Sequence, residues 1–461
     1  MTTSKEIDNS IIKQLADYFI HAQKSDLPEN VALKTKHHIL DTLAAMVSGT
    51  TLPPGEFAIK YAKLQGTSDQ SQIIGTNFLT NAVTASLANG MLAHSDETDD
   101  SHAASGTHPG CTIIPPALAM AEKNQTDGKT FLNSIALGYD MCARFMRAFG
   151  GGTFQRMHGR GFSSHAIGGV FGAAAAAGTH IELDEKKVRY LLSYTTQQAS
   201  GITAWQLDLE HIEKAFDFAG MPCRSGATAA TMVEAGFSGV WDVIEGQNNF
   251  FDCFASEHFR SELIQELGSR YEIMQTNIKK YCVGSPIQAP VDALLNIVRD
   301  HEVNPSDLDN MTVYLAHGDS RLTSDAQTMP DINLRYLLAV SLIDRGLSFE
   351  AGHDFNRMSN EDVVQIMNKI KVETDPSLVS PESPRQGVIE FNHVNGEKFR
   401  NHVVVVKGAM EDPLSTDEVE IKERPLLEMV LGKDKTEQLI DKIWNLESVG
   451  NVRDLRELLR P

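Results

Sequence analysis

The densest group of residues able to do chemistry lies in the string AHSDETDDSHAASGTHPG, from Ala93 to Gly110. Apolar, alanine-rich sequence flanks it on both sides, which predicts burial. Buried ionisable groups must be paired or functional. We therefore take this segment as the first candidate site, with a solvated loop carrying an Asp-rich helix cap as the alternative. Its candidate residues are Glu97, Asp99, Asp100, Ser101, His102 and His108.

The same segment offers nitrogen and oxygen atoms that could bind a metal ion. No known ligand spacing such as HExxH is present, however, so we expect no metal. The residues concerned are His94, Asp99, Asp100, His102 and His108.

Two further motifs could bind an anion. In GRGFSSHAIGG, the residues Arg160, Ser163, Ser164 and His165 precede a small-residue helix, which suits an anionic ligand at a helix start or an ordinary helix cap. In EHIEKAFDFAGMPCRSG, cations lie close to Phe216 and Phe218, which suits a carboxylate ligand; surface salt bridging is the alternative. The cations of that motif are Lys214 and Arg224.

Composition narrows the class of protein. Among 461 residues, 61 are acidic and 41 basic, so the net charge is −20, and no cluster of Lys or Arg offsets it. This argues against a nucleic-acid or anionic-membrane partner. The five cysteines are dispersed without a CxxC pair, and neither a signal-peptide pattern nor an apolar run of about 18 residues is present. We expect a soluble, cytoplasmic protein.

The first half of the chain is predicted to be helical. Apolar residues recur at helical spacing from Ile11 to Phe19, and two more helices are predicted over 28–49 and 56–65. The stretch HAIGGVFGAAAAAG, from His165 to Gly178, suits the centre of a helical bundle because small side chains let backbones approach closely. It lacks GxGxxG spacing and a preceding strand, so we expect no nucleotide cofactor.

After Gly268 the pattern changes to α+β. Strands are predicted over 313–315 and 370–373 around a helix over 361–369, and Asn395-Gly396 predicts a hairpin between 388–391 and 399–406. Helical patterns then return, with a capping box at Ser415 and Glu418 and a looser one at Asp434 and Glu437. The fold class is thus mostly α with an inserted α+β domain: residues 1–268 and 410–461 form a large helical domain, and 269–409 a smaller α+β domain.

Several ordered blocks together resemble the MmgE/PrpD family. They run from AHSDETDDSH and THPGCTIIPPALAMAE through GVFGAAAAAG, EKAF and GMPCRSGATAATMVEAGFSGV to IKKYCVGSPIQAPVDALL and RYLLAVSLIDRG. The resemblance covers nearly the whole chain. It implies a helical domain built from both chain ends, an inserted lid, a cleft between them, a homodimer, and no organic cofactor.

The resemblance also implies roles for single residues. His108 matches the family's HPG histidine, and Lys214 matches the lysine ahead of its Gly-rich block. Glu97, Asp99, Asp100 and Ser101 fall on its acidic and hydroxyl motif. Lys279 matches the lysine that opens the lid, and Tyr336 matches the lid tyrosine. With these we group the further candidates from the motifs above, namely His102, Ser163, His165, Arg224 and Gln288.

Three positions depart from the family pattern. Ser163, Gly284 and Gln288 stand where many members carry histidine, with His165 two residues after Ser163. From the resemblance we expect a cofactor-free lyase that acts on a small di- or tricarboxylate through an enolate-like state. Elimination of water, as in 2-methylcitrate dehydratase, is the first expectation. The alternatives are a decarboxylase, an epimerase or isomerase, and a non-catalytic carboxylate-binding protein.

In the expected mechanism, His108 is the acid or base, because imidazole titrates near neutral pH. Lys214 and Lys279, with Arg224, bind carboxylates, and Tyr336 donates a hydrogen bond or a proton when the lid closes. Glu97, Asp99 and Asp100 are expected either to orient His102 or His108 or to cap the helix, with orientation favoured for Glu97 and a structural role for Asp100.

Overall fold

The computed structural model describes residues 9–150, 157–255, 257–316, 328–380 and 385–461. The chain forms two compact units. The first contains the described parts of residues 1–95, 99–276 and 419–461, and the second contains 96–98 and 277–418. The predicted fold class, mostly helical with a smaller domain of helices and strands, is therefore confirmed. That the smaller domain acts as a lid, opening and closing over a site, stays a prediction.

Among the residues that the structure describes, the regular elements of the first unit are helices and one short pair of strands. Its strands β1 (Ser71–Gln72) and β2 (Leu79–Thr80) are antiparallel. Its helices are α1 (Ile11–Ala22), α2 (Glu29–Gly49), α3 (Pro53–Leu64), α4 (Ala82–Ala93), α5 (Pro109–Asn124), α6 (Gly128–Arg147), α8 (Ser164–Gly178), α9 (Glu185–Gln198), α10 (Ile212–Ala215), α11 (Met221–Glu234), α12 (Phe250–Phe254), most of α18 (Thr416–Leu431) and α19 (Lys433–Trp444).

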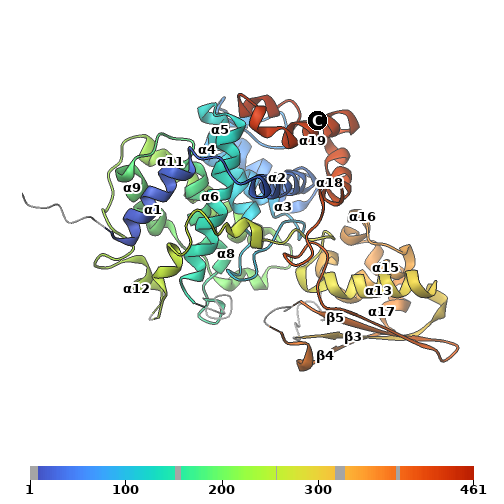
Figure 1. The fold of residues 1–461 in the computed structure, drawn as a ribbon. Coiled ribbons are helices and arrows are strands. Elements are labelled where there is room, and N and C mark those ends of the chain that lie inside the picture. Colours follow the sequence, from blue (N-terminus) through green and yellow to red (C-terminus); the bar gives the residue numbers. More distant parts are fainter. Residues whose placement is uncertain (1–8, 151–156, 256, 317–327, 381–384) are drawn as a thin grey trace, which may run out of the picture. The chain divides into compact units, whose positions relative to one another are not determined.

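Helix α8 lies at the centre of this unit and packs against α5, α6 and α11 (Figure 1). All of its residues are buried, as the small-residue pattern predicted. At Gly172, an added Cβ would lie 2.9 Å from the carbonyl oxygen of Gly138 on α6 and 2.8 Å from the Cys142 Cβ. The two backbones therefore approach more closely than any larger side chain would allow.

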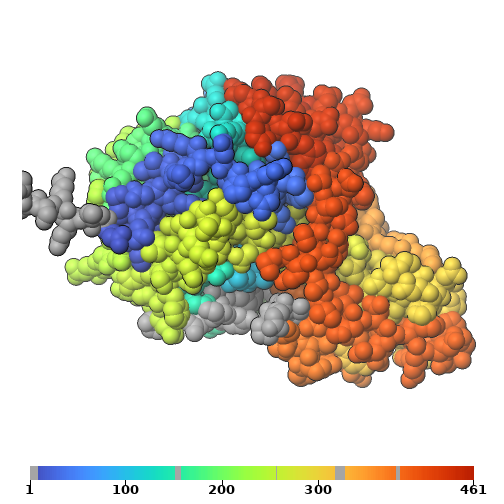
Figure 2. All heavy atoms as spheres, viewed as in Figure 1, coloured from blue at the N-terminus to red at the C-terminus, as the bar shows by residue number. Residues whose placement is uncertain are grey.

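The C-terminal helices return to the first unit. Helix α19 packs against α2, and in Figure 2 the red C-terminal segment lies against blue N-terminal segments. The capping box at the start of α18 is confirmed, because the Ser415 N–H donates to the Glu418 carboxylate at 2.8 Å. The looser box at Asp434 is wrong. Helix α19 begins at Lys433 after Gly432, whose positive φ of 76° separates the two helices.

The second unit contains a four-stranded sheet of order β4-β3-β5-β6. Strand β3 pairs parallel with β4 and antiparallel with β5, and β5 and β6 form the predicted hairpin. Helices lie over one face of the sheet (Figure 1). The elements are α13 (Gln288–His301), β3 (Leu308–Leu315), α15 (Leu334–Asp344), α16 (Phe349–His353), α17 (Glu361–Met367), β4 (Ile370–Thr374), β5 (Gly387–His393) and β6 (Lys398–Val403).

Among the described helices, none is both long enough and apolar enough to span a bilayer.

Candidate active site

One buried carboxylate joins two histidines in the first unit. Asp99 lies in the segment between α4 and α5, and its side chain is fully buried. The Asp99 Oδ2 is 3.0 Å from Nδ1 of His94, the residue that ends α4, and 3.2 Å from Nδ1 of His108, the residue that precedes α5. The His94 ring is buried, whereas the His108 side chain is 12% exposed. Of these three groups, only His108 can therefore be reached from outside.

Aromatic rings enclose this group. Phe218 stacks on His94 with ring centroids 4.5 Å apart and on His165 at 3.7 Å, so it lies between the two imidazoles. The His165 ring is 5.2 Å from that of His108, and Trp205 packs edge-on against Phe218 at 4.7 Å. Burial lowers the pKa values of both His94 and His165. Both rings are therefore neutral near neutral pH, which leaves His108 as the better candidate for proton transfer.

A change of helix type brings Lys214 to the same aromatic wall. Helix α10 continues into one turn of π-helix, η2 (Phe216–Gly220), and π-turns inside helices often mark functional sites. The Lys214 Nζ lies 5.2 Å from the Phe218 centroid and 5.8 Å from that of Trp205. An ammonium beside an apolar wall interacts with a carboxylate more strongly than one in water does. The wall can therefore hold an anionic ligand close to His108.

Ser163 binds the carboxylate of Asp217 in the structure. Its hydroxyl donates to Oδ2 of Asp217 at 2.5 Å, and it accepts the N–H of Ala166 as the N-cap of α8. Ser163 is fully buried. Burial raises the pKa of Asp217 to about 7. The hydroxyl predicted to bind substrate is thus occupied by Asp217, one residue before Phe218.

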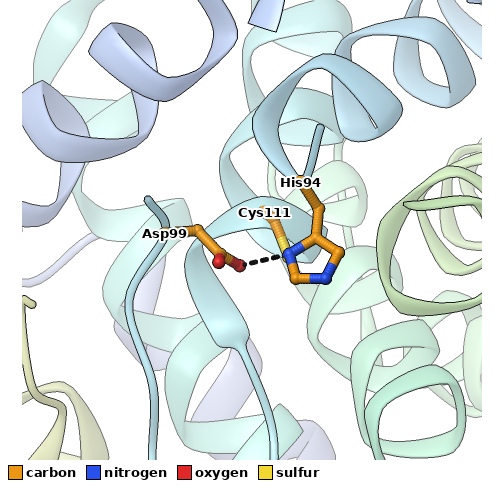
Figure 3. A group of neighbouring side chains, drawn as sticks. All are labelled: His94, Asp99 and Cys111. Carbon is orange, nitrogen blue, oxygen red and sulfur yellow. Dashed lines mark ion pairs between the residues drawn. The ribbon is translucent and has the colours of Figure 1, made fainter. Parts of the chain in front are cut away.

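Three of the side chains could also hold a metal ion. Ligand atoms of His94, Asp99 and Cys111 lie within 4.8 Å of one another, and Figure 3 shows the three side chains converging. Zinc accepts nitrogen, oxygen and thiolate ligands. The Cys111 Sγ is 3.3 Å from the carbonyl oxygen of His108, and burial raises the Cys111 pKa well above its ordinary value, which disfavours the thiolate. Binding of zinc by these three side chains would therefore require loss of the Cys111 thiol proton.

Four predicted site residues lie in the second unit. The Lys279 Nζ donates to the backbone carbonyl of Glu97 at 2.7 Å and lies 3.4 Å from its carboxylate. Gln288 is buried, and its amide binds the backbone of Tyr281 and Val283. Each of these polar groups is thus already bound inside the unit.

Tyr336 lies in the hydrophobic core of the second unit and is fully buried. Its hydroxyl donates to the carbonyl oxygen of Ala351 at 2.6 Å and is 3.2 Å from that of Asp354. Burial raises its pKa to about 12. These contacts are those of a packing residue that fixes α16. They do not favour the predicted role as a donor to substrate.

Two other predicted residues have neighbours outside the His108 group. The His102 Nδ1 is 2.8 Å from Ser105 Oγ, and its Nε2 is 3.3 Å from the Glu272 carboxylate. Arg224 is exposed on α11, with its guanidinium 6.0 Å from the Phe216 ring. Ser101 is half-buried between Asp100 and His102.

Sequence reasoning missed three residues of the wall: Trp205, His211 and His158. His211 is buried, its ring is 5.1 Å from that of His94, and it has a left-handed φ of 62°. His158 stands 5.6 Å from His165. A histidine three residues before Lys214, in a motif already singled out, was the one signal for His211. His158 gave none, because only the packed fold brings it to His165.

The fold and the site define a two-unit protein with a buried histidine–carboxylate pair beside a lysine. The model of the MmgE/PrpD N-terminal domain matches residues 13–262, and that of the MmgE/PrpD C-terminal domain matches residues 281–446. The chain therefore belongs to the MmgE/PrpD family.

Curated relatives match the chain over nearly its full length. A cis-aconitate decarboxylase-like protein of Aspergillus oryzae is 22% identical over 99% of this chain and 98% of its own length. A cis-aconitate decarboxylase of Aspergillus terreus is 20% identical over 98% and 96%. The human cis-aconitate decarboxylase is 23% identical over 98% and 95%.

Proposed function

We propose that this protein is a lyase that cleaves a bond beside a carboxylate of a small di- or tricarboxylate, without a metal or an organic cofactor. The observation that carries the proposal is the Asp99–His108 pair, 3.2 Å apart, at an aromatic wall that also holds Lys214. It combines an acid or base that ligands can reach with a cation for a carboxylate.

The chemistry follows from where charge develops. Lys214 pairs with a carboxylate that the substrate keeps. When the neighbouring bond breaks with loss of carbon dioxide, its electron pair moves toward the retained unsaturated carboxylate system, and His108 delivers the proton that forms the new C–H bond. Asp99 stabilises the imidazolium before this transfer. The dry wall of Phe218 and Trp205 strengthens the attraction between Lys214 and the developing anion.

We place loss of carbon dioxide ahead of the dehydration expected from the sequence. The support is that the relatives reported above are named as decarboxylases or decarboxylase-like proteins, so cis-aconitate is the first substrate to test. In dehydration, His108 would protonate the departing hydroxyl instead, after removal of a proton beside the carboxylate. Both reactions use the same pair and the same lysine.

The test is turnover of a carboxylate panel with a matched histidine control. Cis-aconitate, citrate, 2-methylcitrate and related acids are incubated in heavy water, and products and deuterium uptake are measured by NMR and mass spectrometry. His108→Gln is expected to lower turnover about a thousandfold. His258→Gln removes another histidine paired with an aspartate, at 2.8 Å from Asp252, and is expected to leave turnover unchanged.

A binding protein without turnover would give a different result. Tight carboxylate binding in a thermal-shift screen, with no product and no deuterium uptake from any acid, would contradict the lyase proposal. Equal activity of the wild type and His108→Gln would contradict the role of His108 alone.

We also propose a cytoplasmic homodimer that binds neither nucleic acid nor membrane. The support is the family resemblance, the net charge of −20, and exposed apolar side chains such as Phe57, Leu64 and Leu207 that a second copy could cover. Light scattering coupled to size-exclusion chromatography measures the mass directly. A monomer at micromolar concentration would contradict the dimer.

A further inference from the structure

We propose that Asp100 is a positioning residue: held by His38 and Tyr139, its carboxylate fixes the start of α5 and so sets the position of His108 against Asp99. The inference rests on the proposed function, because it concerns the same site. Asp100 thereby combines the two roles that the sequence left open for it, a structural one and the orientation of a histidine.

The Asp100 carboxylate is fully buried and accepts three hydrogen bonds. Its Oδ1 accepts the backbone N–H of Gly110 at 2.8 Å. Its Oδ2 is 2.7 Å from Nδ1 of His38 on α2 and accepts the hydroxyl of Tyr139 on α6 at 2.5 Å. One side chain therefore ties the start of α5 to two other helices.

The bond to Gly110 acts as a helix cap supplied from a distance. His108 occupies the N-cap position of α5, but its side chain makes no capping hydrogen bond. Pro109 has no N–H, so Gly110 carries the first free amide of the helix. Because Asp100 binds that amide, the His108 ring is free to face Asp99 and the aromatic wall.

Gly110 must be glycine for this contact. An added Cβ would lie 2.6 Å from Oγ1 of Thr42 and 3.0 Å from both Oδ2 of Asp100 and the Tyr139 hydroxyl. The backbone approaches the carboxylate so closely that no side chain fits between them.

The protonation states suit this arrangement. Burial alone raises the pKa of Asp100, but hydrogen bonds from His38, Tyr139 and Gly110 lower it overall, so the acceptor is an ionised carboxylate. Burial raises the pKa of Tyr139 and lowers that of His38, so both remain neutral donors. The adjacent carboxylates thus have separate partners: Asp99 binds the histidines of the wall, and Asp100 binds the scaffold.

The next residue along α6 supplies a matched control. Asp140 is also a fully buried carboxylate that accepts a tyrosine hydroxyl, that of Tyr18 at 2.6 Å, and a backbone N–H, that of Glu272 at 2.7 Å. Within the part of the chain that the structure describes, neither Tyr18 nor Asp140 forms a hydrogen bond to the start of α5. Removing the Tyr18 hydroxyl therefore mimics the stability loss at Tyr139 without touching the capped helix.

The experiment compares Tyr139→Phe with Tyr18→Phe in the full chain, using cis-aconitate as the first probe. We expect Tyr139→Phe to lower kcat about tenfold with KM changed less than twofold, whereas Tyr18→Phe keeps both within twofold. Asp100→Asn and Gly110→Ala should lower kcat further. Equal kcat values for the two tyrosine variants would overturn the proposal, because a purely structural role predicts the same loss at both sites.

A second measurement does not depend on turnover. Carbethoxylation of His108 by diethyl pyrocarbonate, followed by peptide mass spectrometry, reports how freely that ring is exposed. We expect Tyr139→Phe to raise the rate at least about threefold and Tyr18→Phe to leave it unchanged. If the wild type turns over no carboxylate, the proposed function fails while this comparison still decides the positioning role. Equal His108 rates in the two variants would overturn that role.

Discussion

Two buried carboxylates three residues apart bind histidine in different ways. Asp96, which groups with the second unit, has one imidazole partner: its Oδ2 is 2.8 Å from Nε2 of His353. The His353 Nδ1 donates to the carbonyl oxygen of Phe349 at 2.7 Å, so both ring nitrogens are bound. Asp99, in the first unit, is shared by His94 and His108.

The two carboxylates therefore have different effects on their histidines: Asp96 holds His353 in its charged form, whereas Asp99 leaves His108 able to exchange a proton. At His353, burial alone lowers the pKa, but the bond to Asp96 outweighs it and raises the pKa to about 9. That imidazolium keeps its proton at neutral pH. At Asp99, one negative charge cannot hold two imidazoliums, and burial keeps His94 neutral. His108 is then the partner that can exchange a proton with a ligand.

The largest effect in this comparison is expected from a substitution of Asp99, the carboxylate that His94 and His108 share. Asp99→Asn removes the charge that stabilises a His108 imidazolium, so we expect kcat on the best carboxylate of the panel to fall about a hundredfold. Asp96→Asn, which breaks the pair with His353, should lower the free energy of unfolding. It should lower kcat much less than Asp99→Asn does. Steady-state kinetics and chemical unfolding of both variants measure the two effects. A larger loss of kcat in Asp96→Asn would contradict the distinction.

The second prediction concerns the fixed charge at His353. Its folded pKa of about 9 lies above the ordinary value of 6.5, so its contribution to stability is complete below pH 6.5 and is lost as the pH rises through 9. The free energy of unfolding should fall by on the order of 3 kcal/mol across that window. His353→Gln should flatten the curve measured by urea unfolding.

The exposed His301, which stacks on Phe399 at 4.0 Å, provides the control. His301→Gln should keep the pH dependence of the wild type. Parallel curves for the wild type and His353→Gln would show that the Asp96 pair does not hold the charge.

A comparable pH dependence is expected at Asp217, a carboxylate bound to a hydroxyl instead of an imidazole. Its folded pKa of about 7 lies above the ordinary value of 3.8, so its contribution is present below pH 3.8 and is lost as the pH rises through 7. Asp217→Asn removes the cost of ionising a buried acid and should raise stability at pH 8 by on the order of 4 kcal/mol. Thermal unfolding at pH 5 and pH 8 checks this, since the gain should be less than half as large at pH 5.

The sequence predicted the elements better than the contacts of single residues. Helical periodicity, the Asn395-Gly396 hairpin and the capping box at Ser415 act over a few neighbouring residues, so they are visible before folding. Proximity of His108 to Lys214 could be expected only from the family resemblance. The partners of Ser163 and Tyr336 could not be predicted, because the sequence does not show what a hydroxyl will contact after folding. In the structure these partners are Asp217 and a backbone carbonyl.

The smallest expected effect tests whether the Asp99 group works as an acid–base pair or as a metal centre. If His94, Asp99 and Cys111 held a required ion, its removal would abolish turnover, because the three ligands would no longer be held together by the metal. We expect dialysis against EDTA to leave kcat unchanged, since the Asp99 charge is already shared by two imidazoles. Cys111→Ser, which keeps a hydroxyl near the His108 carbonyl, should also keep turnover within about threefold. Loss of activity on chelation, restored by Zn²⁺ in the wild type but not in Cys111→Ser, would replace the acid–base pair with a metal site.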